Sequence, residues 1–405
     1  MKEFVVTVVK DEIAPVARPR LQHSGLDGVH SQQWDAVVVG AGVAGATIAR
    51  LLAKRGHSVL LVEKKQFPRY KVCGCCLNLR SLRHLDEWGI TEKLNTLGAP
   101  TLDSLALHSG GQQAQIPLPG GMAVSRDILD YTLAEVAIEG GAVFLPGTTA
   151  SLTDSPIGPF RSLCLEQGEV AQTVTARLVI AADGLGSKLL RQSNGSREEI
   201  AARSYIGMGA QVVDTDSALS LGRIHLYCSA VGYVGAVRIE ENKVAFAAAL
   251  HPKRLRDSGT PADSIQSIYG AVHQEAPACL EGAKWQGTPP LTRRAPTITG
   301  ERLVALGDAG GYVEPFTGEG MAWAMDAAAY LDEHLATYRP AAWDQASATW
   351  EGVYKKKILP QRIWCRSIST ALRFPRLTTS AVACLSWMPS LSSTIVSAIN
   401  RPKPS

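Results

Sequence analysis

The stretch WDAVVVGAGVAGATIARLLAKRGHSVLLVEKK, residues 34–65, decides the fold. It begins with the apolar run 36–39, which is typical of a strand buried on both faces of a parallel sheet. A glycine-rich turn follows, and the apolar periodicity of residues 43–55 predicts a helix. The order of strand, glycine turn, helix and second strand predicts a βαβ unit that binds a dinucleotide.

Three glycines and one acid carry this prediction. Gly40 makes the tight turn, Gly42 lets the backbone approach a pyrophosphate, and Gly45 lets the helix pack closely on the strand. Glu63 ends the second strand, where a carboxylate accepts a hydrogen bond from an adenosine ribose and disfavours a 2′-phosphate. The unit therefore predicts FAD or NAD rather than NADP.

A second strand–loop–helix block lies at residues 301–333 and favours FAD. Gly307 and Asp308 follow a short apolar strand, and a helix is expected to begin near Gly318–Gly320. Ligands of open α/β sheets lie outside the carboxyl ends of the strands. Asp308 would then bind a ribityl chain, and the positive end of the helix would face an isoalloxazine ring. This second site, far from the first, fits extended, noncovalently bound FAD better than NAD.

The composition is that of a globular protein, with 45% hydrophobic and 19% charged residues in 405. The net charge of +4 comes without a basic block, so nucleic acid is not an expected partner. We expect an α/β fold with a discontinuous Rossmann-like FAD-binding domain, an interposed antiparallel β-sheet substrate domain and a C-terminal helical region. The expected units are a flexible N-terminal extension (1–33), the FAD-binding domain (34–100, 125–200 and 290–335), the substrate domain (101–124 and 201–289) and the helical region (336–405).

Cysteine usage and apolar segments indicate the compartment. Three of the eight cysteines crowd into residues 73–76, which is typical of a reducing, cytoplasmic environment. No secretory signal is visible in residues 1–33. The uncharged segment Leu377–Ile399 predicts either packed helices broken at Pro389 or a lipid-facing surface that admits an apolar substrate. The second alternative would add peripheral membrane contact through the C-terminal region.

Four motifs, in this order, resemble a class of FAD oxidoreductases that includes geranylgeranyl reductases, aromatic hydroxylases and flavin halogenases. They are GAGVAG (40–45) with Glu63, SRDILDYTL (125–133), ADGLGSKLLR (182–191) and GDAGGYVEPFTGEG (307–320). KVCG (71–74) and EPFTGEG (314–320) are most similar to the geranylgeranyl-reductase-like subgroup. The halogenase pattern WxWxIP is absent, and the corresponding strand GYVGAVRI (232–239) also departs from the reductase pattern YxWxFP.

The resemblance extends the set of residues expected to bind FAD. It implies a pyrophosphate or ribityl contact for Arg126, whose alternative is a solvated charge at a helix start. It implies FAD and nicotinamide contacts for Asp183, whose alternative is a strand-end turn residue. The complete implied set is Gly40, Gly42, Gly45, Glu63, Arg126, Asp183, Gly184, Gly307, Asp308, Pro315, Gly318 and Gly320.

Cys73, Cys75 and Cys76 leave three interpretations open. A metal or iron–sulfur site would need a fourth ligand and CxxC spacing, and neither is evident, so we expect no metal. Cys73 would otherwise be a functional thiol beside the flavin, activated by Arg69 or Lys71, and it is the candidate catalytic residue. The interpretation that we favour is simple packing of the loop against the flavin.

These patterns predict an FAD-dependent oxidoreductase that acts on a lipophilic small molecule of the isoprenoid, quinone or polyketide type. NAD(P)H or an electron-donor protein would reduce the flavin, and hydride from flavin N5 would reduce a C=C bond. One alternative is a monooxygenase whose flavin C4a-hydroperoxide hydroxylates an aromatic or polyketide substrate. Another is a non-enzymatic redox flavoprotein that uses the Cys73 loop. No general acid stands out, although Tyr205 and Tyr233 lie in the expected substrate sheet.

Overall fold

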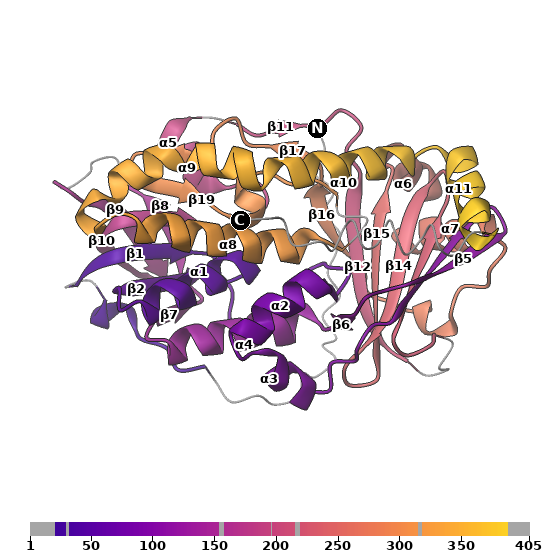
Figure 1. Cartoon of the computed structure of the whole chain (residues 1–405), viewed down its shortest axis with the longest axis horizontal. Helices are drawn as coiled ribbons and strands as arrows, with labels where there is room; N and C mark the ends of the chain where they lie inside the picture. The colour runs from indigo at the N-terminus through magenta and orange to yellow at the C-terminus, as the bar shows by residue number, and fades with distance from the viewer. Residues whose placement is uncertain are drawn as a thin grey trace.

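Two large β-sheets lie side by side in the computed structural model, with helices packed around them (Figure 1). The structure describes residues 21–29, 32–153, 158–195, 197–214, 219–314 and 318–387. The first sheet is mainly parallel and occupies the left half of the view, and the second is mainly antiparallel and occupies the right half. The predicted α/β architecture, with an antiparallel sheet beside a Rossmann-like one, is confirmed.

The first sheet has the strand order β18-β19-β10-β1-β2-β7, and β8 and β9 extend it beyond β10. Its parallel strands are apolar and almost fully buried, as expected for strands covered on both faces. The strands are β1 (Gln33–Val39), β2 (Val59–Glu63), β7 (Val143–Pro146), β8 (Thr149–Leu152), β9 (Arg161–Gln167), β10 (Val170–Ala181), β18 (Thr299–Gly300) and β19 (Leu303–Ala305).

Strand β10 has two roles that the sequence suggested were separate. Its first half pairs antiparallel with β9, and its second half pairs parallel with β1 and β19. The first half alternates towards solvent, whereas residues 178–181 are buried. One continuous strand therefore links a surface hairpin to the centre of the parallel sheet.

The second sheet has the order β16-β12-β15-β14-β13-β4-β5. All neighbours run antiparallel except β4 and β13, which pair in parallel. Glu241 and Asn242, both with positive φ, make the expected tight turn between β14 and β15. The strands are β4 (Ser104–Ser109), β5 (Gln112–Pro117), β12 (Ile206–Val213), β13 (Arg223–Cys228), β14 (Gly232–Ile239), β15 (Lys243–Leu250) and β16 (Gln286–Pro290). Short pairs join β3 (Cys76–Asn78) to β6 (Gly121–Ala123) and β11 (Glu199–Ile200) to β17 (Arg293–Arg294).

Helices from distant parts of the chain meet on the sheets. Helix α1 packs against both α4 and α8, α9 packs against β10, β18 and β19, and α11 packs against β4 and β5. The helices are α1 (Val43–Lys54), α2 (Leu79–Glu87), α3 (Thr91–Thr96), α4 (Arg126–Glu139), α5 (Lys188–Asn194), α6 (Pro252–Ser258), α7 (Pro261–Ala271), α8 (Gly320–Ala336), α9 (Trp343–Lys357), α10 (Leu359–Ala371) and α11 (Pro375–Trp387).

The two ends of the described chain bear on two expectations. Within the expected N-terminal extension, Leu26 and Val29 are buried, and the Trp34 indole N–H donates to the Val29 carbonyl at 3.3 Å. Residues 21–29 therefore pack on the core. Helix α11 covers the uncharged segment as far as Trp387, and Pro389 lies outside the described residues. Nowhere in the described ranges is a helix both long and apolar enough to cross a membrane.

Candidate functional site

The turn between β1 and α1 depends on two glycines for its shape and on a third for an open space. A Cβ atom on Gly40, whose φ is +106°, would collide with the Ala182 carbonyl, and one on Gly45 would collide with the Gly40 carbonyl. A Cβ on Gly42 would instead lie 3.5 Å from Arg126 Nη2 and 3.8 Å from Arg69 Nη2. Gly42 therefore leaves room where the start of α1 faces two guanidinium groups.

A buried charge cluster holds those two guanidinium groups in place. Arg126 donates to both carboxylate oxygens of Asp130 at 2.9 Å, and Arg69 Nη1 lies 3.0 Å from Asp130 Oδ2. The Asp130 side chain is fully buried and that of Arg126 is 7% exposed. The alternative of a solvated charge at the start of α4 therefore does not hold for Arg126. Sequence reasoning missed Asp130, although it lies in a quoted motif, one helical turn after Arg126.

Glu63 ties the second strand to the glycine turn. Its carboxylate accepts from the backbone N–H groups of Ala41 and Lys65, each at 3.0 Å. Arg69 Nη2 lies 3.4 Å from the same carboxylate. Glu63 thus lies at the expected end of β2, and its contact with an adenosine ribose stays a prediction.

The donors at this turn fit the ADP half of FAD. The first N–H groups of α1 have no partner within the helix, and the helix dipole places positive charge there. The Nε of Arg69 is buried and has no hydrogen-bond partner among the described residues. Glu63 and Asp130 balance the charges of Arg69 and Arg126, so the helix terminus and the unpartnered donor supply the additional attraction for a pyrophosphate.

The expected ring end of the site forms around the turn Gly307–Gly310. Lys71 Nζ lies 3.7 Å from Asp308 Oδ2. The Arg362 guanidinium donates to the carbonyls of Gly307 at 3.0 Å and Gly310 at 3.2 Å, which fixes the turn from behind. Sequence reasoning missed Arg362, because nothing local relates it to a turn more than fifty residues earlier.

Helix α8 starts at Gly320, where sequence reasoning expected a helix to begin. A Cβ on Gly318 would lie 3.6 Å from the Cys76 carbonyl, so the start of α8 meets the cysteine loop. This contact brings the two glycines of the expected flavin-ring loop close to Cys76. Pro315, from the same set, lies outside the described residues.

Asp183 and Gly184 lie at the carboxyl end of β10, beside the glycine turn. One oxygen of Asp183 accepts from the N–H groups of Lys188 at 2.9 Å and Leu189 at 3.4 Å, so Asp183 shapes the turn into α5. Its other oxygen is buried without a partner among the residues described, and burial raises its pKa. The turn role is therefore observed, and contacts with FAD or nicotinamide stay predictions.

The cysteine loop lies between the two sheets. A Cβ on Gly209, in β12, would approach Tyr70 Oη to 2.8 Å and Val72 Cγ1 to 2.9 Å, so the loop rests directly on the second sheet. Cys73 Sγ accepts from the Cys75 N–H at 3.4 Å. A hydrogen bond from the Cys75 side chain and the charge of Arg126 lower the pKa of Cys73 to about 6, although burial opposes this.

Metal binding by this loop finds no support in the described residues. They contain no group of three or more potential metal ligands and, although they include all eight cysteines, no disulfide. Burial raises the pKa of Cys76, and burial together with Cys73 raises that of Cys75. Cys73 is thus the member of the trio suited to ionise near neutral pH.

The second sheet presents small residues towards this loop. Gly209, Ala247 and Gly235 are paired across β12, β15 and β14, so the middle of the face has almost no side chains. In contrast, His225 and Tyr227 lie on the other side chain period of β13, where Tyr227 packs with Tyr269 of α7. The glycine and alanine face therefore leaves depth for an apolar molecule between the sheet and the loop.

Glu314 is a further acid that sequence reasoning missed. Its side chain is 1% exposed, and one oxygen accepts from Arg373 Nη2 at 3.2 Å. The Tyr233 hydroxyl also forms a hydrogen bond with it. The other oxygen is buried with no partner in the described part of the chain, and burial raises the pKa of Glu314. Its signal in the sequence was a lone acid between apolar residues just before the glycine loop.

Glu314 and Arg373 line a pocket between the second sheet and the C-terminal helices. Tyr205, Tyr233 and Ser369 contribute to the same pocket, which encloses about 230 Å³ of empty space. Arg373 stacks over the Tyr205 ring with 4.4 Å between its Cζ and the ring centroid. The pocket therefore combines two phenol rings with one buried carboxyl group.

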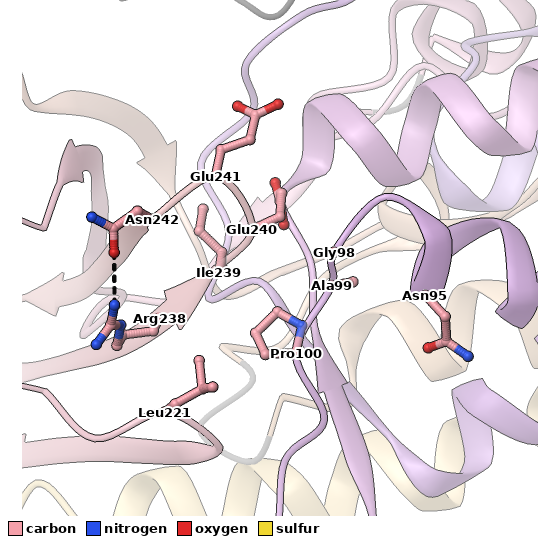
Figure 2. Close-up of a pocket in the computed structure, with 10 residues that line it drawn as sticks. All are labelled: Asn95, Gly98, Ala99, Pro100, Leu221, Arg238, Ile239, Glu240, Glu241 and Asn242. Atoms are coloured by element: carbon pink, nitrogen blue, oxygen red, sulfur yellow. Dashed lines mark hydrogen bonds between the residues drawn. The ribbon is translucent and has the colours of Figure 1, made fainter.

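A larger, open pocket lies elsewhere, between the loop after α3 and the β14–β15 turn (Figure 2). Arg238 and Asn242 form a hydrogen bond of 2.7 Å along its edge. Glu240 lines it and accepts from the Ser125 N–H at 3.1 Å, which is a structural contact. None of the residues expected to bind FAD lines this pocket, so it is not the candidate cofactor site.

Comparisons with known proteins agree with this geometry. A family model described as "FAD binding domain" matches residues 33–345. A menaquinone reductase of Mycolicibacterium smegmatis is 29% identical over 72% of this chain and 74% of its own length. A kynurenine 3-monooxygenase of Salinispora arenicola is 27% identical over 79% of this chain and 76% of its own. The crystal structure of a flavoprotein/dehydrogenase from Cytophaga hutchinsonii superposes with a TM-score of 0.73 at 18% identity, covering 91% of this chain and 99% of that one, which shows a shared fold.

Proposed function

The chain belongs to the FAD-binding domain family of flavin-dependent oxidoreductases and monooxygenases, and from that premise we propose that it reduces a carbon–carbon double bond in a lipophilic small molecule. Isoprenoid and quinone compounds are the substrate classes that we expect. Bound FAD would supply the two-electron chemistry. We propose that NAD(P)H or an electron-carrier protein reduces the flavin.

The FAD is proposed to lie across the carboxyl end of the first sheet. Arg69, Arg126 and the start of α1 would hold the pyrophosphate, and Asp308 would bind the ribityl chain. The cysteine loop and the start of α8 would border the ring. These assignments rest on the two guanidinium groups around Gly42 and on the contact between Gly318 and the Cys76 carbonyl.

The buried carboxyl of Glu314 is the observation that carries the reductase proposal. Saturation of a double bond needs one proton in addition to hydride, and a carboxyl group with a raised pKa keeps its proton more readily near neutral pH. Glu314 hydrogen-bonds to Tyr233, which comes from the second sheet. We propose that this pair supplies the proton, while the glycine and alanine face of the sheet accommodates an apolar chain and excludes water.

A second candidate function is hydroxylation. It is favoured by the similarity to a kynurenine 3-monooxygenase over 79% of the chain. The similarity to a menaquinone reductase, at 29% identity, favours reduction of a quinone-type substrate. Both candidates use the same flavin site and differ in whether the product gains hydrogen or oxygen.

A product analysis distinguishes the two candidates. The FAD-loaded protein is reduced anaerobically with NADH, NADPH or dithionite and then mixed with a prenylated naphthoquinone, with and without O₂. We expect a product that has gained two hydrogen atoms, formed without O₂. A product that gains one oxygen atom, and only when O₂ is present, would replace the reductase proposal with hydroxylation. Turnover with dithionite but with neither nicotinamide would indicate an electron-carrier protein as donor.

A further inference from the structure

The outer faces of helices α10 and α11 carry an unusual concentration of exposed apolar side chains. Six of the eleven exposed large hydrophobic residues in the described chain come from residues 359–387. We call them the α10–α11 apolar face: Leu359, Ile363, Trp364, Phe374, Leu377 and Trp387, with exposed fractions of 40% to 86%. The other five are spread singly over the rest of the molecule, where isolated exposed apolar residues are ordinary.

The same part of the chain is strongly basic. Residues 352–405 contain nine lysines and arginines and no aspartate or glutamate. The whole chain has a net charge of +4, so residues 1–351 carry a net charge of −5. Arg366 and Arg376 are exposed and lie among the apolar residues of the two helices. The molecule is therefore electrostatically polarised, with its positive end at α10 and α11.

Helix α10 also has an inner face that reaches the candidate site. Arg362 on this face holds the carbonyls of Gly307 and Gly310. Ser369 and Arg373 line the pocket that contains Glu314. In Figure 1, α10 runs along the upper edge of the molecule and α11 lies at its right end, beside the second sheet. One thin helical layer thus separates the pocket from the apolar face.

We propose that the α10–α11 apolar face docks on the surface of an anionic lipid bilayer. Aromatic and aliphatic side chains interspersed with arginine and lysine are suited to the boundary between headgroups and acyl chains. Anionic headgroups attract the basic end of the molecule. A second copy of the chain would bring two positively charged ends together, which disfavours self-association through this face. This proposal deepens the proposed function, since a lipophilic substrate would reach the pocket from the layer on which α10 lies.

Vesicle binding tests the docking without any substrate. The full-length, FAD-loaded protein is sedimented with phosphatidylcholine vesicles that contain about one third phosphatidylglycerol, and with phosphatidylcholine alone. We expect binding to the anionic vesicles to be roughly tenfold or more tighter. Changing Ile363→Ser and Trp364→Ser together should weaken it roughly tenfold or more, because two apolar side chains no longer enter the interface. Arg366→Gln with Arg376→Gln should lower binding to the anionic vesicles only.

The matched control is the double change Ile200→Ser and Leu221→Ser, which removes comparably exposed apolar residues far from α10 in sequence. It should leave vesicle binding unchanged. Flavin content and melting temperature verify that each variant is folded. Absence of binding to anionic vesicles, or equal loss in the control, would overturn the proposal. So would a dimer in solution that Trp364→Ser dissociates. Because no turnover is measured, failure of docking leaves the reductase proposal intact.

Discussion

Changing Gly42 to alanine should separate FAD binding from folding. The backbone of Gly42, at φ −82° and ψ −175°, suits alanine, and the new Cβ would be 3.5 Å from Arg126 Nη2, an ordinary contact. The apoprotein should therefore lose only about 0.5–1 kcal/mol of stability, the usual difference for alanine at a helix N-cap. The methyl group would, however, fill the space that we assign to the pyrophosphate.

The expected loss of affinity follows from the hydrogen bonds that the methyl group displaces. A hydrogen bond to a charged group contributes about 1.5–3 kcal/mol. Loss of one such bond between the pyrophosphate and α1 or a guanidinium group would raise the Kd for FAD by roughly 10- to 150-fold. Gly45→Ala is the matched comparison, since its Cβ would collide with the Gly40 carbonyl. That change should lower the stability of the apoprotein by about 1–3 kcal/mol through overpacking.

Two measurements test this pair of variants. Titration of apoprotein with FAD, followed by quenching of flavin fluorescence, gives the Kd. Thermal unfolding of the same apoprotein gives its stability. An unchanged Kd for Gly42→Ala would refute the assignment of the pyrophosphate to this turn. Equal destabilisation by Gly42→Ala and Gly45→Ala would refute the distinction between an open and a packed glycine.

Three further outcomes are expected. Asp308→Ala should purify with much less flavin than wild type, whereas Asp308→Asn should keep more of it; full occupancy in the alanine variant, read from the absorbance spectrum, would count against the ribityl assignment. Alkylation of Cys73 in the apoprotein should reach half its maximal rate near pH 6, the value to which its pKa is lowered, because the thiolate reacts; peptide mass mapping should show Cys76 reacting only at much higher pH, and a midpoint near 9 for Cys73 would contradict the geometry. Arg373→Leu should reduce the free energy of unfolding at neutral pH by about 3–5 kcal/mol, because it leaves the buried Glu314 carboxylate unpaired. This loss should shrink as the pH falls through the raised pKa of Glu314, and Glu314→Gln in the same chain should recover most of it; denaturant titrations that show no recovery would refute the pairing.

Local patterns predicted the parts of the structure that depend on neighbouring residues. Residues 43–55 predicted a helix, and α1 spans Val43–Lys54. Ser125 caps α4 by accepting from the Ile128 N–H, as its place before an apolar-periodic run suggested. The resemblance to the class of FAD oxidoreductases, based on four motifs, is confirmed by the family and its named relatives, which are enzymes. A purely non-enzymatic role is therefore no longer favoured.

The contacts that sequence reasoning missed join residues far apart in the chain. Arg69 meets Asp130, Arg362 meets Gly307, and Arg373 meets Glu314. No periodicity or spacing relates such partners, because tertiary packing alone brings them together. The same reason explains why β10 was expected as two strands, since its pairing with both β9 and β1 depends on the folded sheet. The substrate, the nicotinamide donor and the residues that contact FAD stay predictions.

The order of strands in the first sheet has a consequence for how the chain is made. β1 is complete at Val39, but its neighbour β10 begins only at Val170, roughly 130 residues later. At a synthesis rate of about 5–20 residues per second, the ribosome needs roughly 7–26 s to deliver that partner. During this time one edge of an apolar strand is exposed on the nascent chain, together with the unfinished glycine turn. Helix α8 and its glycines emerge later still, so FAD can meet its complete site only when most of the chain has been translated. Slow translation or scarce flavin should therefore reduce the yield of folded protein more than any single surface substitution.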